Sequence, residues 1–152
     1  MPLNKRRVVV TGIGAITPIG LSADEFWNNM MNSVSGSALI KGFDTSRVTT
    51  KFACELKGVD PTNYIDEKTA RRLDPYAQYA LASTAEAVND SGINTSTLSD
   101  SDRGRIGVIF GSGIGGMQTF YQQALVNDKE GPKRVSPFFI PMLIPDIAAG
   151  HI

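Results

Sequence analysis

The stretch GSGIGG at 111–116 combines residue types and spacing that could bind a phosphate group. Its glycines at 111, 113 and 116 follow the pattern G-x-G-x-x-G, in which backbone N–H groups at a helix start hold the pyrophosphate of a dinucleotide. The apolar run RIGVIF precedes it and MQTFYQQAL follows it, so the order of strand, glycine loop and helix is satisfied. The spacing alone permits a nicotinamide or flavin cofactor.

A dinucleotide site also requires an acidic residue about 20 positions further on, at the end of the next strand, to bind the ribose. Asp128 lies at that distance, but its surroundings, VNDKEGPKR, are typical of a helix end and a turn. An earlier loop, GIGAITPIG at 12–20, has Thr17 in place of the third glycine and only Asp44 as its acidic residue. We therefore favour a structural role, in which the glycines allow a sharp turn and the close approach of another backbone.

Nucleophilic and metal chemistry have few candidate residues. Cys54 is the only cysteine, and it falls in the alternating segment VTTKFACELKG, which predicts a half-buried strand with Phe52, Cys54 and Leu56 facing the core. No histidine lies near it in the sequence to act as its base. His151, the only histidine, has no identifiable serine or cysteine partner, so we assign no catalytic role to either residue and expect no metal site.

Two clusters of basic residues could bind an acidic partner. EKTARR places Lys68, Arg71 and Arg72 at i, i+3 and i+4, which share one face if the segment is helical, and GPKRVS adds Lys133 and Arg134. The 15 basic and 15 acidic residues give a net charge of zero, so the broad attraction used by nucleic-acid-binding proteins is absent. Such clusters are usually only solvated, but in a neutral chain they could bind an acidic protein.

The elements that must position these residues alternate between strands and helices. RRVVVTG at 6–12 and RIGVIF at 105–110 are rich in β-branched and apolar residues and predict two buried strands, each followed by a glycine loop. A helix is expected after each loop. The first is capped by Ser22 and Glu25 in the pattern S-x-x-E, and the second spans about 114–128. The repeated order predicts an α/β fold.

Two further segments have clear signals. Asp74 as N-cap, Pro75 at the first helical position and Gly92 just past the end predict a helix that starts at Pro75 and ends before Gly92. In the last stretch, GPKRVSPFFIPMLIPDIAAGHI, four prolines interrupt dense apolar content, so we expect no single regular helix but a segment packed into a core or a partner. Because it ends without a polar tail, we expect the chain to be part of a longer protein.

Length and composition are those of one soluble globular domain, with 152 residues of which 41% are hydrophobic and 20% charged. No apolar run approaches the roughly 20 residues needed to span a membrane, and the start MPLNKRRVVV lacks the features of a secretory signal. We therefore expect a cytoplasmic protein that binds neither membranes nor nucleic acids.

Several segments become recognisable when taken together, in order: KRRVVVTGIGAITPIG, FDTS, RRLDPYAQYA, DSG, GVIFGSGIGGM and GPKRVSPFFIPMLIPDIAAGHI. They resemble the N-terminal part of β-ketoacyl-[acyl-carrier-protein] synthases, closest to the type II condensing enzymes of bacterial fatty-acid synthesis. The resemblance covers nearly the whole chain. It implies an α/β fold of the thiolase type, with five layers α/β/α/β/α in the full enzyme, which works as a homodimer, and makes residues 1–152 a partial N-terminal domain.

The resemblance also implies a reaction. In this family a cysteine takes an acyl group from its carrier protein, and malonyl carrier protein then loses carbon dioxide and attacks the acyl-enzyme, without a cofactor. The nucleophile and the two catalytic histidines are expected beyond Ile152, so the resemblance assigns no catalytic residue to this chain, which alone should be inactive.

What the resemblance assigns to this chain is substrate and partner binding. Ile114 resembles the residue that gates the acyl pocket, and Phe139 resembles the one that reaches the pocket across the dimer interface. The basic residues resemble those that bind the acidic carrier protein: Lys68, Arg71, Arg72, Lys133 and Arg134. Three alternatives remain open: a type I condensing enzyme or polyketide ketosynthase, a non-catalytic dimerisation or carrier-docking module, and the less favoured dinucleotide-binding domain.

Overall fold

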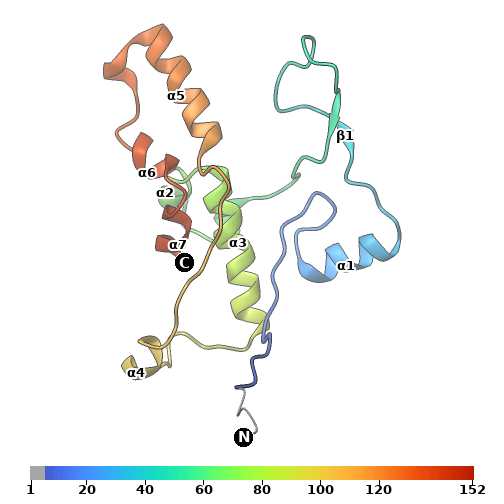
Figure 1. Ribbon diagram of the computed structural model, residues 1–152, viewed down its shortest axis with the longest axis vertical. Helices are drawn as coiled ribbons and strands as arrows, with labels where there is room; N and C mark the ends of the chain where they lie inside the picture. The colour runs from blue at the N-terminus through green and yellow to red at the C-terminus, as the bar shows by residue number, and fades with distance from the viewer. Residues whose placement is uncertain (1–5) are drawn as a thin grey trace, which may run out of the picture.

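The computed structural model describes residues 6–152 (Figure 1). Helices predominate in this part of the chain, and the longest of them, α3, lies at its centre with the other elements around it. In chain order the elements are α1 (Ala23–Met31), β1 (Ala38–Leu39), β2 (Phe52–Ala53), η1 (Pro61–Asn63), α2 (Glu67–Ala70), α3 (Pro75–Asp90), α4 (Asp100–Arg103), α5 (Met117–Glu130), η2 (Pro132–Arg134), α6 (Phe139–Leu143) and α7 (Ile147–His151).

Helix α3 confirms the prediction made from its end signals. The Asp74 carboxylate accepts a hydrogen bond from the Tyr76 N–H, Pro75 opens the helix, and Gly92 follows its end with a φ of 72°. The small buried side chains Ala77 and Ala80 line its core face. They pack in a cluster with other buried and half-buried apolar residues: Leu73, Ala148, Ile65, Leu81, Phe110 and Ile147.

The loop 12–20 packs directly onto α3. A Cβ atom on Gly14 would lie only 1.9 Å from the Ser83 carbonyl oxygen, so a larger residue there would push the two backbones apart. Glu86 of α3 completes the contact, since its carboxylate accepts hydrogen bonds from the N–H groups of Ala15 and Ala23, both at 2.8 Å. The loop and the start of α1 are therefore fixed to the central helix.

Helix α1 begins where the capping box predicts. The Ser22 hydroxyl accepts a hydrogen bond from the Glu25 N–H at 3.1 Å, and the Glu25 carboxylate accepts one from the Leu21 N–H at 2.7 Å. The helix ends at Met31, and the chain turns at Ser33, whose φ is 56°.

The predicted buried strands at 6–12 and 105–110 are wrong for this part of the chain. Both segments run as irregular extended chain in Figure 1, and neither pairs with a strand within residues 6–152. Their side chains are largely exposed, with Val8 at 91% and Ile109 at 102%. An extended segment becomes a strand only through hydrogen bonds to a neighbour, and the apolar pattern cannot supply that neighbour.

The predicted strand around Cys54 is also much shorter than expected. Strands β1 and β2 pair antiparallel with Ala38 opposite Ala53 and Leu39 opposite Phe52, and pairing stops there. Phe52 is 62% exposed and Cys54 is exposed, so the expected core position of this cysteine is wrong. No layer in the described part of the chain covers that face of the two-stranded sheet, so alternation does not lead to burial.

The C-terminal stretch confirms that the prolines prevent one regular helix. Its ordered parts are the short segments η2, α6 and α7, of which α6 packs against α5 and α7 packs against α3. Helix α5 begins at Met117, slightly later than expected, because GSGIGG continues as a loop up to Gly116.

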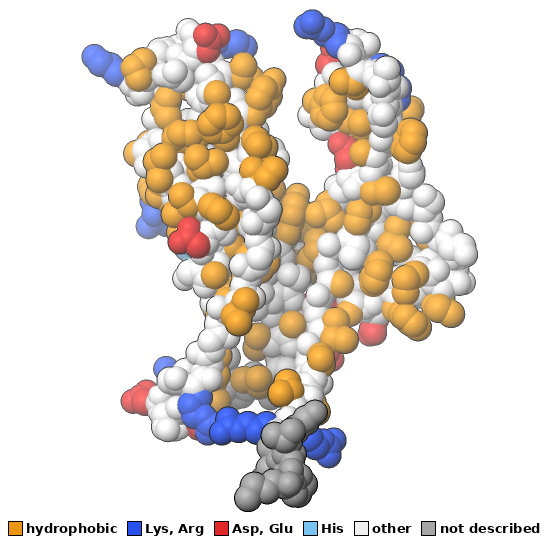
Figure 2. Space-filling view, in the orientation of Figure 1, with side chains coloured by type: hydrophobic (Ala, Val, Ile, Leu, Met, Phe, Trp, Pro, Cys, Tyr) orange, Lys and Arg blue, Asp and Glu red, His pale blue; other side chains and the backbone are white. Residues whose placement is uncertain are grey.

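Figure 2 shows that the molecule forms two arms with a hollow between their upper parts, and Figure 1 shows the arms on either side of α3. One arm carries α5, α6 and α2, and the other carries α1 and the β1–β2 hairpin (Figure 1). Hydrophobic side chains are spread over the visible surface of both arms. Few large apolar side chains are therefore fully enclosed in the described chain.

Candidate functional site

The glycine loop at 111–116 is held against α6. The Gly116 N–H donates a hydrogen bond to the Leu143 carbonyl oxygen at 2.9 Å, and a Cβ on Gly116 would lie 2.1 Å from the Met142 carbonyl oxygen. Gly111 and Gly113 have nothing near their Cα that excludes a side chain. The expected close approach of another backbone is therefore confirmed at Gly116, which is the residue before α5.

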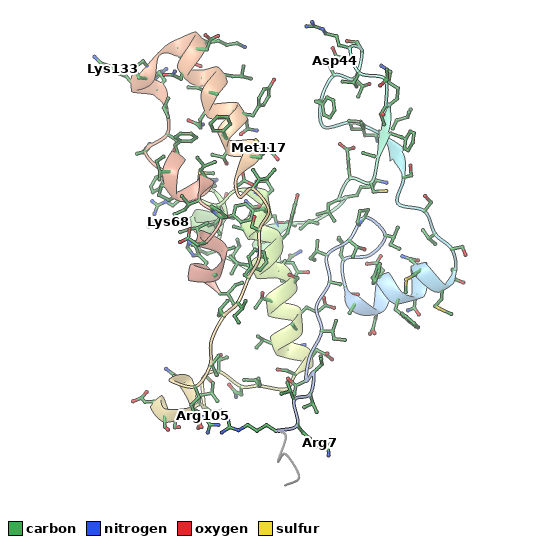
Figure 3. The ribbon with its side chains drawn as sticks, in the orientation of Figure 1. Arg7, Asp44, Lys68, Arg105, Met117 and Lys133 are labelled. Carbon is green, nitrogen blue, oxygen red and sulfur yellow. The ribbon has the colours of Figure 1, made fainter. Side chains whose placement is uncertain are left out.

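The acidic residue considered for this glycine loop is not positioned as a dinucleotide site requires. Asp128 lies in the last turn of α5, about 17 Å from the glycine loop at 1.5 Å per residue. Asp44, which was considered for the loop 12–20, lies on the arm with the β1–β2 hairpin (Figure 3), where its carboxylate accepts hydrogen bonds from the Ser46 N–H and hydroxyl, which lower the pKa of Asp44. The geometry favours the structural role of the glycines.

A buried carboxylate joins the starts of α3 and α5. Asp74, only 2% exposed, accepts the Tyr76 N–H with one oxygen and the Thr119 N–H with the other, at 3.2 and 2.8 Å. Charged hydrogen bonds of this kind are among the stronger ones in proteins. Asp74 was expected only as the N-cap of α3, so its contact with α5 is a new finding that sequence spacing could not reveal.

A second contact anchors the chain between α6 and α7. The Tyr76 hydroxyl donates a hydrogen bond to the Ile144 carbonyl oxygen at 2.6 Å. Burial, together with the nearby carboxylates of Asp74 and Asp146, raises the pKa of Tyr76, so the hydroxyl keeps its proton and remains a donor. Helix α6 is thus fixed at its C-terminal end by both the glycine loop and α3.

The two expected pocket residues lie at opposite ends of this assembly. Ile114 is 63% exposed on the glycine loop, directly before the residues that contact α6. Phe139 is half-buried at the start of α6, and its ring stacks on Phe120 of α5 with the centroids 6.3 Å apart. The hydrogen bond from Gly116 to Leu143 therefore joins the segments that carry Ile114 and Phe139.

The first basic cluster lies on and just after α2. Asp66 caps this helix, and hydrogen bonds from the Thr69 hydroxyl and N–H lower the pKa of Asp66. Lys68 extends from the helix, whereas Arg71, at its C-terminal end, forms an exposed ion pair with Glu67. Such pairs contribute little to stability, so Arg71 is free to exchange partners.

The second cluster lies on η2, beyond the end of α5. Lys133 and Arg134 are exposed there, and the Arg134 Nε lies 3.4 Å from the Glu130 carboxylate. Figure 3 shows Lys68 and Lys133 on the same side of the molecule. All five expected basic residues therefore lie on the arm that carries the glycine loop, α5 and α6.

One contact connects the α2 cluster to α6. The Arg72 guanidinium carbon lies 4.5 Å from the centroid of the Phe138 ring, in a cation–π arrangement. Phe138 was not predicted as a site residue. The only available signal was the adjacent aromatic pair in SPFF, because Arg72 and Phe138 are far apart in the sequence.

The residues considered for nucleophilic and metal chemistry are dispersed. Cys54 follows β2 on one arm, and His151 ends α7, which packs on α3. Within residues 6–152, no three His, Cys, Asp or Glu side chains form a group that could hold a metal ion. No helix among the same residues has both the length and the apolar character needed to cross a membrane.

Comparison with known proteins identifies the family. The sequence profile described as "Beta-ketoacyl synthase, N-terminal domain" matches residues 5–152. This chain belongs to the β-ketoacyl synthase family. It is 44% identical over 147 residues to 3-oxoacyl-[acyl-carrier-protein] synthase 2 of Staphylococcus aureus strain N315, covering 97% of this chain and 35% of the relative. The corresponding Synechocystis protein is 38% identical over 148 residues, or 97% and 35% of the two chains.

Solved structures place this chain in the thiolase-like fold of ketosynthases. The ishigamide ketosynthase/chain length factor has a TM-score of 0.77 at 26% identity, covering 94% of this chain and 35% of that one. A β-ketoacyl synthase from Burkholderia phymatum has a TM-score of 0.78 at 24% identity, covering 96% and 36%. A type II polyketide ketosynthase, solved with its acyl carrier protein, has a TM-score of 0.76 at 23% identity, covering 97% and 38%. The expected α/β fold class is confirmed.

Proposed function

We propose that this chain is the N-terminal part of a 3-oxoacyl-[acyl-carrier-protein] synthase that elongates acyl chains in fatty-acid biosynthesis. The reaction is the decarboxylative condensation of an acyl carrier protein with malonyl carrier protein. The 44% identity to synthase 2 proteins over 97% of the chain carries this proposal. The chain spans about 35% of the length of those relatives, so the activity belongs to a longer protein, of which residues 1–152 form a partial N-terminal domain without the catalytic cysteine and histidines.

In that enzyme, this chain supplies part of the acyl pocket and of the dimer. Ile114 gates the pocket, and Phe139 reaches it across the homodimer interface. Two observations support these roles. Ile114 is exposed, as a side chain that moves to admit an acyl chain must be. Phe139 is packed against Phe120, as a side chain that lines the pocket in a fixed position must be. The homodimer and a cytoplasmic location are part of the same proposal.

The acidic acyl carrier protein binds the basic residues of the α2 and η2 clusters: Lys68, Arg71, Arg72, Lys133 and Arg134. Their position on one arm supports this assignment, since clustered charges attract an acidic partner although the net charge of the chain is zero. The ion pairs of Arg71 and Arg134 are exposed and weak, so binding a carrier carboxylate costs little. Rim charges of this kind mainly accelerate association.

Charge reversal tests the carrier-binding surface. Arg71→Glu and Lys133→Glu should each weaken carrier binding about fivefold or more at low salt, and should flatten its salt dependence. Lys57→Glu is the matched control, because it makes the same change in net charge at an exposed residue outside both clusters. Calorimetric titration of each of the three variants with acyl carrier protein measures the affinity. Equal effects of the three substitutions, or none, would contradict the assignment.

The family also leaves related functions open. A type I condensing enzyme or a polyketide ketosynthase would use the same pocket and carrier surface, and two of the similar structures are ketosynthases of other pathways by their names. A non-catalytic dimerisation or carrier-docking module is the alternative of a different class. It predicts carrier binding by this chain but no condensation in any longer protein that contains it.

A further inference from the structure

We infer that Phe138 positions Arg72 for carrier binding and couples that binding to helix α6. This inference rests on the carrier-binding surface proposed above. Its basis is the stacking of the Arg72 guanidinium over the Phe138 ring, with 4.5 Å between the guanidinium carbon and the ring centroid. The contact directly links the α2 cluster to the segment that carries Phe139.

Arg72 differs from its neighbour Arg71 in how it is held. Arg71 pairs with Glu67 on its own helix, whereas Arg72 forms no ion pair within residues 6–152. The ring leaves the N–H groups at the edge of the guanidinium available, because stacking occupies only one face of the plane. An arginine already ordered in this way loses less side-chain entropy when it binds a carboxylate.

Phe138 is the N-cap residue, directly before the first residue of α6. The next residue, Phe139, stacks on Phe120 of α5, and the last residue of the helix, Leu143, accepts the hydrogen bond from Gly116. The short helix therefore contacts Arg72 at one end and the loop of Ile114 at the other. A shift of Arg72 on carrier binding would therefore move α6, a helix of five residues, and with it both proposed pocket residues.

Coupling of this kind is reciprocal. If carrier binding orders α6, then an ordered α6 strengthens carrier binding. Removal of the Phe138 ring should therefore weaken carrier binding and also reduce the ordering of α6 by the carrier. The aromatic character of residue 138 should matter more than its volume, because the attraction arises from the ring face.

A double-mutant cycle on the full chain tests the first step. Carrier affinity is measured by calorimetry for Phe138→Leu, Arg72→Gln and the double variant, after circular dichroism has verified folding. Phe138→Leu should weaken binding about two- to fivefold, the range expected for an exposed cation–π contact. The double variant should bind no more weakly than Arg72→Gln alone, and Phe138→Trp should retain wild-type affinity. Phe43→Leu makes the same change at an exposed phenylalanine on the other arm and should have no effect.

Hydrogen exchange tests the second step. Saturating carrier should slow amide exchange over residues 139–144 in the wild-type chain but not in Phe138→Leu at equal saturation. Additive effects in the cycle, or equal protection in the two proteins, would overturn the inference while leaving carrier binding intact. If the wild-type chain binds no carrier, the proposed docking surface fails and the inference fails with it.

Discussion

At the residue scale, the two glycines at 113 and 116 lie in one loop but in different surroundings. Gly116 faces the Met142 carbonyl oxygen so closely that a Cβ would lie 2.1 Å away, whereas a Cβ on Gly113 would meet nothing within 4 Å. Gly116→Ala should therefore lower the free energy of unfolding by about 1–3 kcal/mol, because backbone must shift to make room. Gly113→Ala should change it by less than about 0.5 kcal/mol. Urea denaturation distinguishes them, and equal costs would refute the packing role of Gly116.

Asp74 makes a second prediction at this scale. In Asp74→Asn, one of the two carboxylate oxygens becomes an NH₂ group that faces a backbone N–H, so one buried hydrogen bond is lost. The expected cost is about 1–3 kcal/mol of unfolding free energy, measured by urea denaturation. Asp146→Asn is the matched control, because Asp146 caps α7 without a side-chain hydrogen bond. A neutral Asp74→Asn would mean that the α3–α5 contact contributes nothing.

At the scale of the elements, one carboxylate holds the start of the segment between β1 and β2. Glu55 accepts hydrogen bonds from the N–H groups of Lys41 and Gly42, both at 3.0 Å, and these bonds lower the pKa of Glu55. Because the folded pKa is the lower one, the contribution of these bonds is complete above the unfolded value of about 4.3 and is lost as the pH falls through the folded value.

The lowered pKa of Glu55 can be tested directly by nuclear magnetic resonance. The amide protons of Lys41 and Gly42 should move together with pH, with a midpoint below about 4.3. In Glu55→Gln both amides should lose that transition, while the amide of Thr62, which is hydrogen-bonded to Asp60, should keep its own. A midpoint above 4.3 in the wild-type chain would contradict the hydrogen-bonded geometry.

The elements also show which features the sequence could predict. Helices α1 and α3 follow from local signals, because Ser22, Glu25, Asp74 and Pro75 act within a single turn of their helix. The segments at 6–12 and 105–110 carry equally clear apolar patterns, yet a strand depends on a neighbour that lies elsewhere in the sequence. The same limit hid Phe138, whose partner Arg72 belongs to another element. Ile114 and Phe139 were assigned to the acyl pocket by resemblance to the family, and their roles stay proposals.

At the scale of the molecule, exposed apolar surface is the main physical feature. Val8, Val10 and Ile109 are 91%, 80% and 102% exposed, and extended apolar segments without strand partners favour association. We expect the chain alone to associate or to unfold with low cooperativity, and Ile109→Thr to reduce association. Light scattering across a concentration series, combined with thermal melting, measures both. A monodisperse monomer with a cooperative transition would contradict this expectation.

The central claim is that this chain supplies the N-terminal part of a fatty-acid condensing enzyme. The most direct test is to replace the matched segment of the Staphylococcus aureus synthase 2, which is 44% identical over 147 residues, with this chain and to measure condensation of acyl and malonyl carrier proteins. We predict that the chimaera elongates acyl chains and that Arg71→Glu lowers its kcat/KM for carrier-bound substrate. A folded chimaera that binds carrier protein but forms no 3-oxoacyl product would contradict the claim.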